Sequence, residues 1–387
     1  HPSNASAIQI GSASGNEHGT VLIENNYILN VLSSDVADTH GVLGFGKNIA
    51  IRKNYIENCN GSSSNVDDEA ITVRGARFCI EGNRVIDSSH GEGSIHAKGA
   101  SEFGLFADNW VTDTRTSVQV NSIRSIGGQV VIRGNRLEGQ STGINVVDND
   151  ATVTENTIIA DNLGAPTSIG VQLTGVARAV VANNRMNIGY AGASNAWGIR
   201  PTTDSSAITV TGNLAELEAS NRRLVEITGT GTLDQLSVTG NITDGVDFGV
   251  DADSGVTVTN VSVNNNQWGT MNPNGGILHP NVIAGLNAPS EGVVEEVDEA
   301  FPTLSIYVPS KLDGSSNTVL ATLPDGDYVG QIKTVTAIDV TNTPELTISN
   351  HEDSVDQNYA FPNVDDYVVL IWLGTYWSTL KATATII

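Results

Sequence analysis

Cysteine, methionine, aromatic and basic residues are all scarce in this chain of 387 residues. It has 2 Cys, 2 Met and 5% aromatic residues, and 19 Lys and Arg stand against 43 Asp and Glu, a formal net charge of −24. Two cysteines cannot build a disulfide framework. The negative charge argues against nucleic acid and anionic membranes as partners. Runs of 18 apolar residues are absent, so we expect no membrane-spanning segment.

The acidic composition favours a soluble protein that is secreted or exposed to salt. Strand alternation predicts that Cys59 and Cys79 point outward on different faces as free thiols. No signal peptide is visible. The chain begins with His1 and Pro2, close upstream of a strand-like segment at residues 7–10. We therefore hypothesise that the natural N-terminus lies further upstream.

Asparagine recurs in one frame, with an apolar residue three positions before it and usually another two positions after it. The positions are Asn26, Asn54, Asn83, Asn109, Asn135, Asn156, Asn184, Asn213, Asn241 and Asn266. The period is about 27 residues, which indicates a solenoid. Asn suits a tight bend for two reasons. It tolerates a left-handed backbone, and its amide can bond to the equivalent Asn of the next coil.

Each repeat also contains a second alternating segment with a β-branched residue at one inward position. This column comprises Val42, Ile71, Ile95, Val118, Ile144, Val171, Ile199, Val225 and Val250. A stacked parallel sheet buries such residues. The sequence therefore predicts an all-β fold, a right-handed parallel β-helix of about ten coils with three strands per coil. At about 4.8 Å per coil the rod is roughly 48 Å long.

The Asn ladder and the three-strand coil resemble the pectate-lyase type of β-helix, to which phage tailspike depolymerases are similar. The resemblance covers roughly residues 7–275 and is specific for the fold. It leaves the reaction open, because the family includes lyases, hydrolases, isomerases and adhesins. In such proteins the sheet that carries the second segment, with the loops leading into it, forms the substrate groove.

A different pattern follows the last repeat. Residues 269–288 are rich in Gly, Pro and Asn and predict a linker. Short alternating strands after them predict a small antiparallel β-sandwich. We therefore expect a β-helix catalytic domain over residues 1–275 and a trimerisation or carbohydrate-binding module over residues 276–387. This module resembles the C-terminal modules of phage tail proteins that trimerise their spikes, which implies a homotrimer.

The outward positions of the second segment form a stripe that is rich in basic and amide side chains. One column comprises Leu43, Thr72, His96, Gln119, Asn145, Gln172, Arg200, Glu226 and Asp251. Its neighbour includes Phe45, Arg74, Lys98, Asn121 and Asp253. Such a stripe on a protein of charge −24 suits an extended, anionic, hydroxyl-rich chain. We therefore expect an acidic polysaccharide as the ligand.

Cleavage by β-elimination is the preferred hypothesis, because the basic residues crowd the centre of the stripe. The reaction needs a base near the operating pH and a cation beside the developing enolate. His96 or Lys98 would be the base, Arg74 or Arg124 the cation, and Tyr190 the acid. The expected substrate-binding residues are Gln119, Asn121, Arg124, Asn145, Gln172, Arg200 and Arg115.

Glycoside hydrolysis by two carboxylates is the alternative. The candidate carboxylates are Asp67, Asp68, Glu69, Glu92 and Asp148. The run at residues 67–69 also offers oxygens of the kind that Ca²⁺ binds. However, Ca²⁺ takes six to eight oxygens, and three adjacent carboxylates cannot all converge on one ion. A solvated turn is therefore the preferred interpretation, with Ca²⁺ as an alternative cofactor and no metal site assigned.

The sequence therefore predicts an endo-acting depolymerase of an anionic polysaccharide. A sulfated fucan or a uronate polymer such as alginate would suit the stripe. A tailspike-type glycoside hydrolase acting on capsule or lipopolysaccharide is the second hypothesis. A polysaccharide-binding spike or adhesin without catalysis is the third.

Overall fold

The computed structural model describes residues 4–11, 18–32, 38–59, 68–88, 92–98, 102–115, 121–163, 165–253, 255–264, 266–278, 295–306, 309–326, 332–351, 357–373 and 375–387. These residues form strands and turns only, which confirms the predicted all-β class. Among them there is no helix long and apolar enough to cross a membrane.

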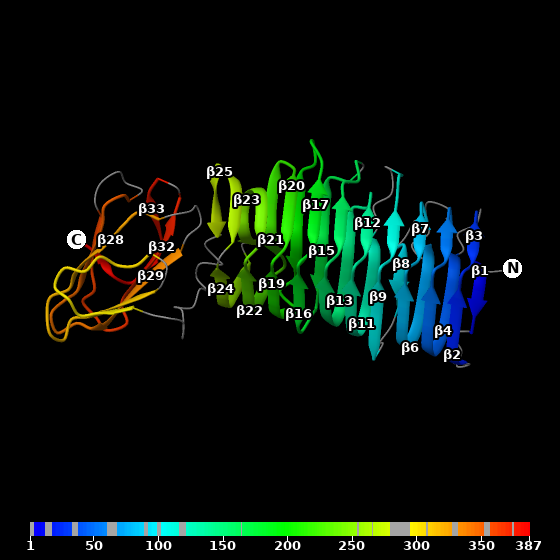
Figure 1. The fold of residues 1–387 in the computed structure, drawn as a ribbon, viewed down its shortest axis with the longest axis horizontal. Helices are drawn as coiled ribbons and strands as arrows, with labels where there is room; N and C mark the ends of the chain where they lie inside the picture. The colour runs from blue at the N-terminus through cyan, green and yellow to red at the C-terminus, as the bar shows by residue number, and fades with distance from the viewer. Residues whose placement is uncertain are drawn as a thin grey trace.

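A parallel sheet of 25 strands winds into a rod of stacked coils with three faces (Figure 1). The first face holds β1 (Asn4–Ile10), β8 (Ile95–Ala97), β15 (Thr167–Thr174), β18 (Asn195–Pro201) and β21 (Asn221–Ile227). The second holds β2 (His18–Glu24), β9 (Phe103–Ala107), β16 (Ala179–Ala182), β19 (Ser206–Thr211), β22 (Gly231–Thr239) and β24 (Val256–Asn264). The third, which follows the Asn bend, holds β3 (Tyr27–Leu29), β5 (Tyr55–Glu57), β7 (Arg84–Ile86), β10 (Trp110–Thr112), β12 (Arg136–Glu138), β14 (Thr157–Ala160), β17 (Arg185–Gly189) and β20 (Leu214–Glu218).

Six longer strands pass from one face to the next. Four bend from the first face to the second, namely β4 (Asp38–Arg52), β6 (Glu69–Glu81), β11 (Asn121–Arg133) and β13 (Thr142–Thr154). Two bend from the third face to the first, namely β23 (Ile242–Ala252) and β25 (Gln267–Leu278). The predicted parallel β-helix of about ten coils is therefore confirmed.

The predicted inward column lies in the buried core in every coil but one. The exception is the coil of β11, where Ile123 pairs with Ile95 on one side and Ile144 on the other. Ile123 is buried in the core, and it takes the place predicted for Val118, which lies outside the described residues. The alignment of this coil was therefore wrong by five residues. The correction moves Arg124 into the outward column, in the place predicted for Gln119.

The asparagines form a continuous hydrogen-bonded ladder. The main-chain N and Nδ2 of each ladder Asn donate to Oδ1 of the Asn one coil on, from Asn26 to Asn266, at 2.8–3.0 Å. The bonding between coils was predicted correctly, but the reason based on backbone conformation was wrong. The left-handed residue is the one before the ladder Asn, for example Lys53, Asp108 or Glu155, with φ of 52–58°.

The C-terminal part of the chain forms two small sheets with their own core. One contains β26 (Glu295–Val297), β27 (Ser310–Asp313), β29 (Ile332–Asp339), β32 (Tyr367–Trp372) and β33 (Trp377–Ala382), and the other contains β28 (Leu320–Leu323), β30 (Glu345–Ile348), β31 (Gln357–Ala360) and β34 (Thr385–Ile386). The predicted β module is therefore present, with parallel as well as antiparallel pairs. Ile371 of β32 joins the core of the coils, so this module packs against the rod.

Two smaller predictions need correction. Residues 269–278 belong to β25 and pair with β23, whereas their composition predicted a linker. The main-chain pairing of the last coil therefore overrides the breaker residues. Cys59 is fully buried and points into the core, while Cys79 is partly exposed; both are free. Cys59 follows the short strand β5 at a bend, where strand alternation does not apply.

We predict that Asn109→Ala lowers the free energy of unfolding by roughly 2–4 kcal/mol. The substitution leaves two buried donors of Asn83 without their acceptor, and it removes the hydrogen bonds that Asn109 donates to Asn135 and Ile80. Denaturant titration measures this loss. Asn26→Ala, at the partly exposed end of the ladder, is the matched control and should cost clearly less. Equal losses for the two variants would contradict a stabilising role of the buried ladder.

Candidate active site

The register of the first face brings the predicted basic residues together. Thr72 of β6 pairs with His96 of β8, and His96 pairs with Arg124 of β11. Lys98 directly follows β8, and its main-chain N donates to Val73 O of β6. Because neighbouring strands lie about 4.8 Å apart, these side chains share one small area. The prediction that His96 and Lys98 lie together is therefore supported by their contacts.

Glu69 is the centre of this area. Its Oε1 lies 3.1 Å from His96 Nδ1 and 2.8 Å from Lys98 Nζ. Its Oε2 lies 3.1 Å from His40 Nδ1 and accepts a hydrogen bond of 3.0 Å from Thr72 Oγ1. Glu69, Thr72 and His96 are fully buried, and His40 is nearly so. A buried carboxylate is tolerated when donors surround it in this way.

A local break in strand alternation places Glu69 on the outward side. Strict alternation would set Ala70 outward and Ile71 inward, but both residues belong to the buried core. The strand therefore bends between them, and Glu69 lies on the same side as Thr72. The position of Ala70 is occupied by Gly41 and Gly170 in other coils, where neighbouring coils approach closely. A Cβ on Gly41 would lie 2.7 Å from Ala70 O, and one on Gly170 would lie 2.5 Å from Gly198 O.

The surroundings of Glu69 keep it ionised. Burial favours the neutral acid and raises its pKa, but the hydrogen bonds from His40 and His96 and the charge of Lys98 outweigh burial, so that the pKa falls well below its ordinary value. A carboxylate with so low a pKa cannot act as a general acid near neutral pH. Glu69 therefore serves as an anchor for the groups around it.

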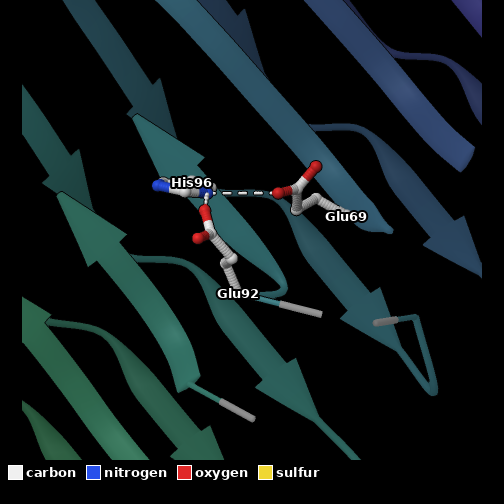
Figure 2. A group of neighbouring side chains, drawn as sticks. All are labelled: Glu69, Glu92 and His96. Atoms are coloured by element: carbon white, nitrogen blue, oxygen red, sulfur yellow. Dashed lines mark hydrogen bonds and ion pairs between the residues drawn. The ribbon is translucent and has the colours of Figure 1, made fainter. Parts of the chain in front are cut away.

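His96 is held as a neutral imidazole with one nitrogen free to accept a proton. Burial lowers its pKa, although the hydrogen bond to Glu69 opposes this effect. Because Glu69 is ionised, Nδ1 carries the proton and donates it to Glu69 Oε1, which leaves the lone pair on Nε2. Nε2 is buried, and no described residue forms a hydrogen bond with it. Figure 2 shows both glutamates on the Nδ1 side of the ring and Nε2 on the far side.

Glu92 forms the more exposed edge of the cluster, with about a third of its side chain in contact with solvent. Its Oε2 lies 3.4 Å from His96 Nδ1, and its Oε1 lies 2.7 Å from Arg124 Nη1. Asn121 Nδ2 donates to the main-chain O of Glu92. Lys98 and Arg124 are also partly open to solvent. A ligand would therefore meet two cations and Glu92 before it reached His96.

The cluster is poorly suited to Ca²⁺. Oxygens of Glu69 and Glu92 and a ring nitrogen of His96 lie within 4.8 Å of one another. However, Lys98 and Arg124 already neutralise these carboxylates, and Ca²⁺ prefers six to eight oxygen ligands to a nitrogen. The alternative of a Ca²⁺ cofactor therefore has no support from this group of residues.

Several predicted residues lie apart from the cluster. Tyr190 lies in the turn after β17, four coils from His96, or roughly 19 Å along the rod, so its assignment as the acid is wrong. Arg115 forms a bidentate pair with Asp113, with Nη2 to Oδ2 at 2.6 Å. Asp148 is exposed at the corner beyond the stripe. Arg74 is the exception, because it lies one coil before Lys98 in the same column; it is exposed, with its guanidinium 5.7 Å from the ring of Phe45.

The remaining predicted residues have other positions. Asp68 is buried and accepts a hydrogen bond of 2.8 Å from Thr39 N, so it holds the main chain. Asn145 and Gln172 continue the outward column beyond Arg124 and are half-buried, as expected for a groove floor. Gln119 and Asp67 lie outside the described residues.

A second cluster of charged residues occupies the far end of the same column. Glu226 of β21 pairs with Asp251 of β23, and both are nearly buried. Arg223 Nε lies 3.0 Å from Glu226 Oε2 and donates a short hydrogen bond to Asp251 Oδ2. Two carboxylates therefore converge on one guanidinium. Arg200, one coil before Glu226, lies with its guanidinium 4.3 Å from the ring of Trp197.

Glu226 has the pKa of a general acid. Burial raises it to about 7; Arg223 opposes this effect, and the negative charges of Asp251 and Asp253 reinforce it. A carboxyl group with a pKa raised in this way can donate a proton near neutral pH. The sequence placed Glu226 and Asp251 in the outward column but assigned them no role. The signal that could have indicated a site is that these two carboxylates are neighbours in the outward column.

We predict that Glu69→Gln lowers the free energy of unfolding at pH 7 by about 3–5 kcal/mol, because Lys98 loses its counter-ion and the buried donors of Thr72 and His96 lose a charged acceptor. Since the folded-state pKa of Glu69 is depressed, its contribution is complete above its ordinary value of 4.5 and is lost as the pH falls below it. The difference between variant and wild type should therefore shrink in acid. Denaturant titrations at pH 7 and pH 3 measure the difference in the free energy of unfolding, and Glu92→Gln, at a more exposed position, is the control. A difference that does not depend on pH would contradict the ionised state of Glu69.

No protein-family model and no curated protein matches this sequence. Among solved structures, a double mutant of the tailspike protein of E. coli bacteriophage HK620 is similar at 12% identity, covering 99% of this chain and 84% of that one, with a TM-score of 0.47. Another double mutant of that tailspike, in complex with a pentasaccharide, has 11% identity, the same coverage and a TM-score of 0.37. These neighbours are of the kind that the resemblance named, while the strand pairing itself establishes the β-helix.

Proposed function

We propose that this protein is a depolymerase of an anionic polysaccharide and that it acts by β-elimination at the His96 cluster. The observation that carries the proposal is the state of His96. Its Nδ1 is fixed by ionised Glu69, while its buried Nε2 has no described partner. A neutral imidazole oriented in this way would act as a general base through its other nitrogen, which the substrate would have to reach.

The neighbouring cations fit the charge that elimination develops. Nε2 of His96 would accept the proton from the carbon next to a uronate carboxylate. The electron pair left on that carbon forms a C=C bond as the bond to the glycosidic oxygen breaks, and the departing oxygen takes a proton from water. Lys98 and Arg124 are paired with Glu69 and Glu92 but partly open to solvent, and they would stabilise the enolate oxygens in the transition state. Lys98 is ion-paired with Glu69 at 2.8 Å, which favours its role as a cation over that of a base.

The chemistry selects between the two substrate classes that suit a basic stripe. Elimination requires an acidic C–H bond next to a carboxylate, which a uronate polymer such as alginate has and a fucan whose acidic groups are sulfates lacks. We therefore propose a uronate polymer as the substrate. The elongated first face, with Asn145 and Gln172 beyond the cluster, supports endo-acting cleavage of a long chain.

We predict that His96→Gln lowers kcat on a uronate polymer by about 10²–10⁴-fold, as loss of a general base does. The measurement is the ultraviolet absorbance of the new C=C bond conjugated to the carboxylate. Asn48→Ala, an exposed substitution on the second face, is the control and should leave the rate unchanged. Near-native activity of His96→Gln would exclude this residue as the base.

Glycoside hydrolysis is a second candidate function, and the Glu226 cluster favours it. Glu226, with its pKa raised to about 7, would protonate the leaving oxygen, and Asp251, which accepts a hydrogen bond from Arg223, would be the second carboxylate. A tailspike-type hydrolase acting on capsule or lipopolysaccharide would use such a pair. New reducing ends without the absorbance of a C=C bond would favour this function over elimination.

If Glu226 is the acid of a hydrolase, we predict that reducing-end formation falls as the pH rises above about 7 and disappears in Glu226→Gln. The same group affects stability. Because its folded-state pKa is raised, its stabilising contribution is present below its ordinary value of 4.5 and is lost as the pH rises through about 7. Glu226→Gln should remove this loss between pH 5 and pH 8 in denaturant titrations. If the free energy of unfolding of Glu226→Gln depends on pH as that of the wild type does, Glu226 does not have the raised pKa on which both its effect on stability and its role as the acid depend.

Assembly and location complete the proposal. We propose an extracellular homotrimer, secreted or in a virion tail, on the resemblance of the C-terminal module. Light scattering of the purified chain tests the trimer. A spike or adhesin without catalysis is the outcome if polysaccharide binds but neither unsaturated nor reducing ends form.

A further inference from the structure

The third face carries an exposed stack of aromatic rings and guanidinium groups at its N-terminal end. Tyr27, Tyr55, Arg84, Trp110 and Arg136 occupy the same position on consecutive strands. The rings of Tyr27 and Tyr55 stack at 4.7 Å, and Arg84 lies 5.6 Å from Tyr55 and 4.4 Å from Trp110. Arg136 follows at 5.3 Å from Trp110. Tyr27 is 68% exposed and Trp110 39%, so the stack lies open to solvent.

A hollow of ≈310 Å³ continues this stack along the rod. It begins at Arg136 and is lined on the following strands by Ile159, Arg185, Asn187 and Glu216, among others. Figure 1 shows the strands concerned, from β3 through β7 and β12 to β17 and β20, in succession along one edge of the rod. Two guanidinium groups, an amide and a carboxylate around a hollow of this size can orient one polar ring.

The charged side chains of this surface differ in their partners. The third-face strands from β3 to β17 carry three arginines, Arg84, Arg136 and Arg185, and two glutamates, Glu57 and Glu138. Arg136 pairs with Glu138, which also accepts a hydrogen bond from Trp110 Nε1. Among the described residues, no carboxylate forms an ion pair with Arg84 or Arg185. Guanidinium groups without a carboxylate partner beside exposed Trp and Tyr are typical of binding surfaces.

We propose that the exposed residues from Tyr27 to Arg185 form an accessory track that binds an acidic glycan without cleaving it. The edges of the stacked rings and Trp110 would contact sugar rings, and Arg84 and Arg185 would bind carboxylates. From β3 to β17 the track spans roughly 29 Å at about 4.8 Å per strand, which suits a polymer better than a single sugar.

The track lies on a different face from His96, so it would hold a long substrate near the first face and would not contact the reacting bond. The choice of a uronate polymer rests on the proposed function; the track itself rests on separate residues. Stacking of the aromatic rings on one another and on the guanidinium groups also stabilises the sheet. The exposed rings alone are therefore no evidence for a ligand. Cation–π contacts explain Arg84 and Arg136 in the same way. Arg185 and the hollow that it lines are the features that such stabilisation leaves unexplained.

The test is affinity electrophoresis of the full chain through gels that contain alginate, with dextran as the neutral polymer. A His96→Gln background prevents turnover. We expect alginate to retard the protein and the double substitution Arg84→Ala/Arg185→Ala to weaken binding about tenfold. Arg178→Ala, an exposed arginine on the second face that pairs with Asp150, is the matched control and should not change retardation. Thermal unfolding verifies that each variant is folded.

Kinetics separate the track from the active site. In the otherwise wild-type chain the double substitution should raise KM for the long polymer and leave the turnover of short oligouronates unchanged. Equal retardation of the double variant and its parent would overturn the track. A different outcome would separate the two proposals. If alginate retards the protein only when Arg84 and Arg185 are present, but the chain never produces unsaturated ends, the track is confirmed and elimination is overturned. Equal retardation by dextran would also overturn an acidic ligand.

Discussion

The register between coils is the constraint on which the rest of this structure depends. Parallel main-chain pairing and the buried Asn ladder set each coil on the next at about 4.8 Å, with no freedom to slide. Residues about 27 positions apart therefore become neighbours. Glu69, His96 and Arg124 meet because each lies on the first face of a successive coil. A slip of one residue would turn these side chains into the core.

Buried charge gives the first face two different kinds of site. Glu69 receives four donors, so it stays ionised and fixes the tautomer of His96. Glu226 shares a single guanidinium with Asp251, and the incomplete compensation lets burial raise its pKa. The same residue type on the same sheet is therefore held ionised in one coil and has a raised pKa in another. Elimination and hydrolysis are thus proposed at different places along the rod.

The errors of the sequence-based predictions have local physical causes. The coil of β11 was misaligned because residues 117–122 alternate as well as residues 122–127 do, and alternation alone cannot measure the length of the preceding loop. Glu69 was assigned to a loop because the bend between Ala70 and Ile71 interrupts the alternation. Tyr190 was chosen for its chemistry, although counting coils from His96 would have excluded it.

The sequence by itself determined the coil. The ladder Asn and the inward β-branched column repeat with a period that only a stacked parallel sheet can bury, so the fold and the identity of the exposed face followed from pattern. Tertiary structure decided what those outward residues do. The protonation states of His96 and Glu226 depend on burial and on partners from other coils and loops, and the arginines of the third face meet their aromatic neighbours only across strands. Such contacts join residues whose separation varies from coil to coil, so periodicity alone does not specify them.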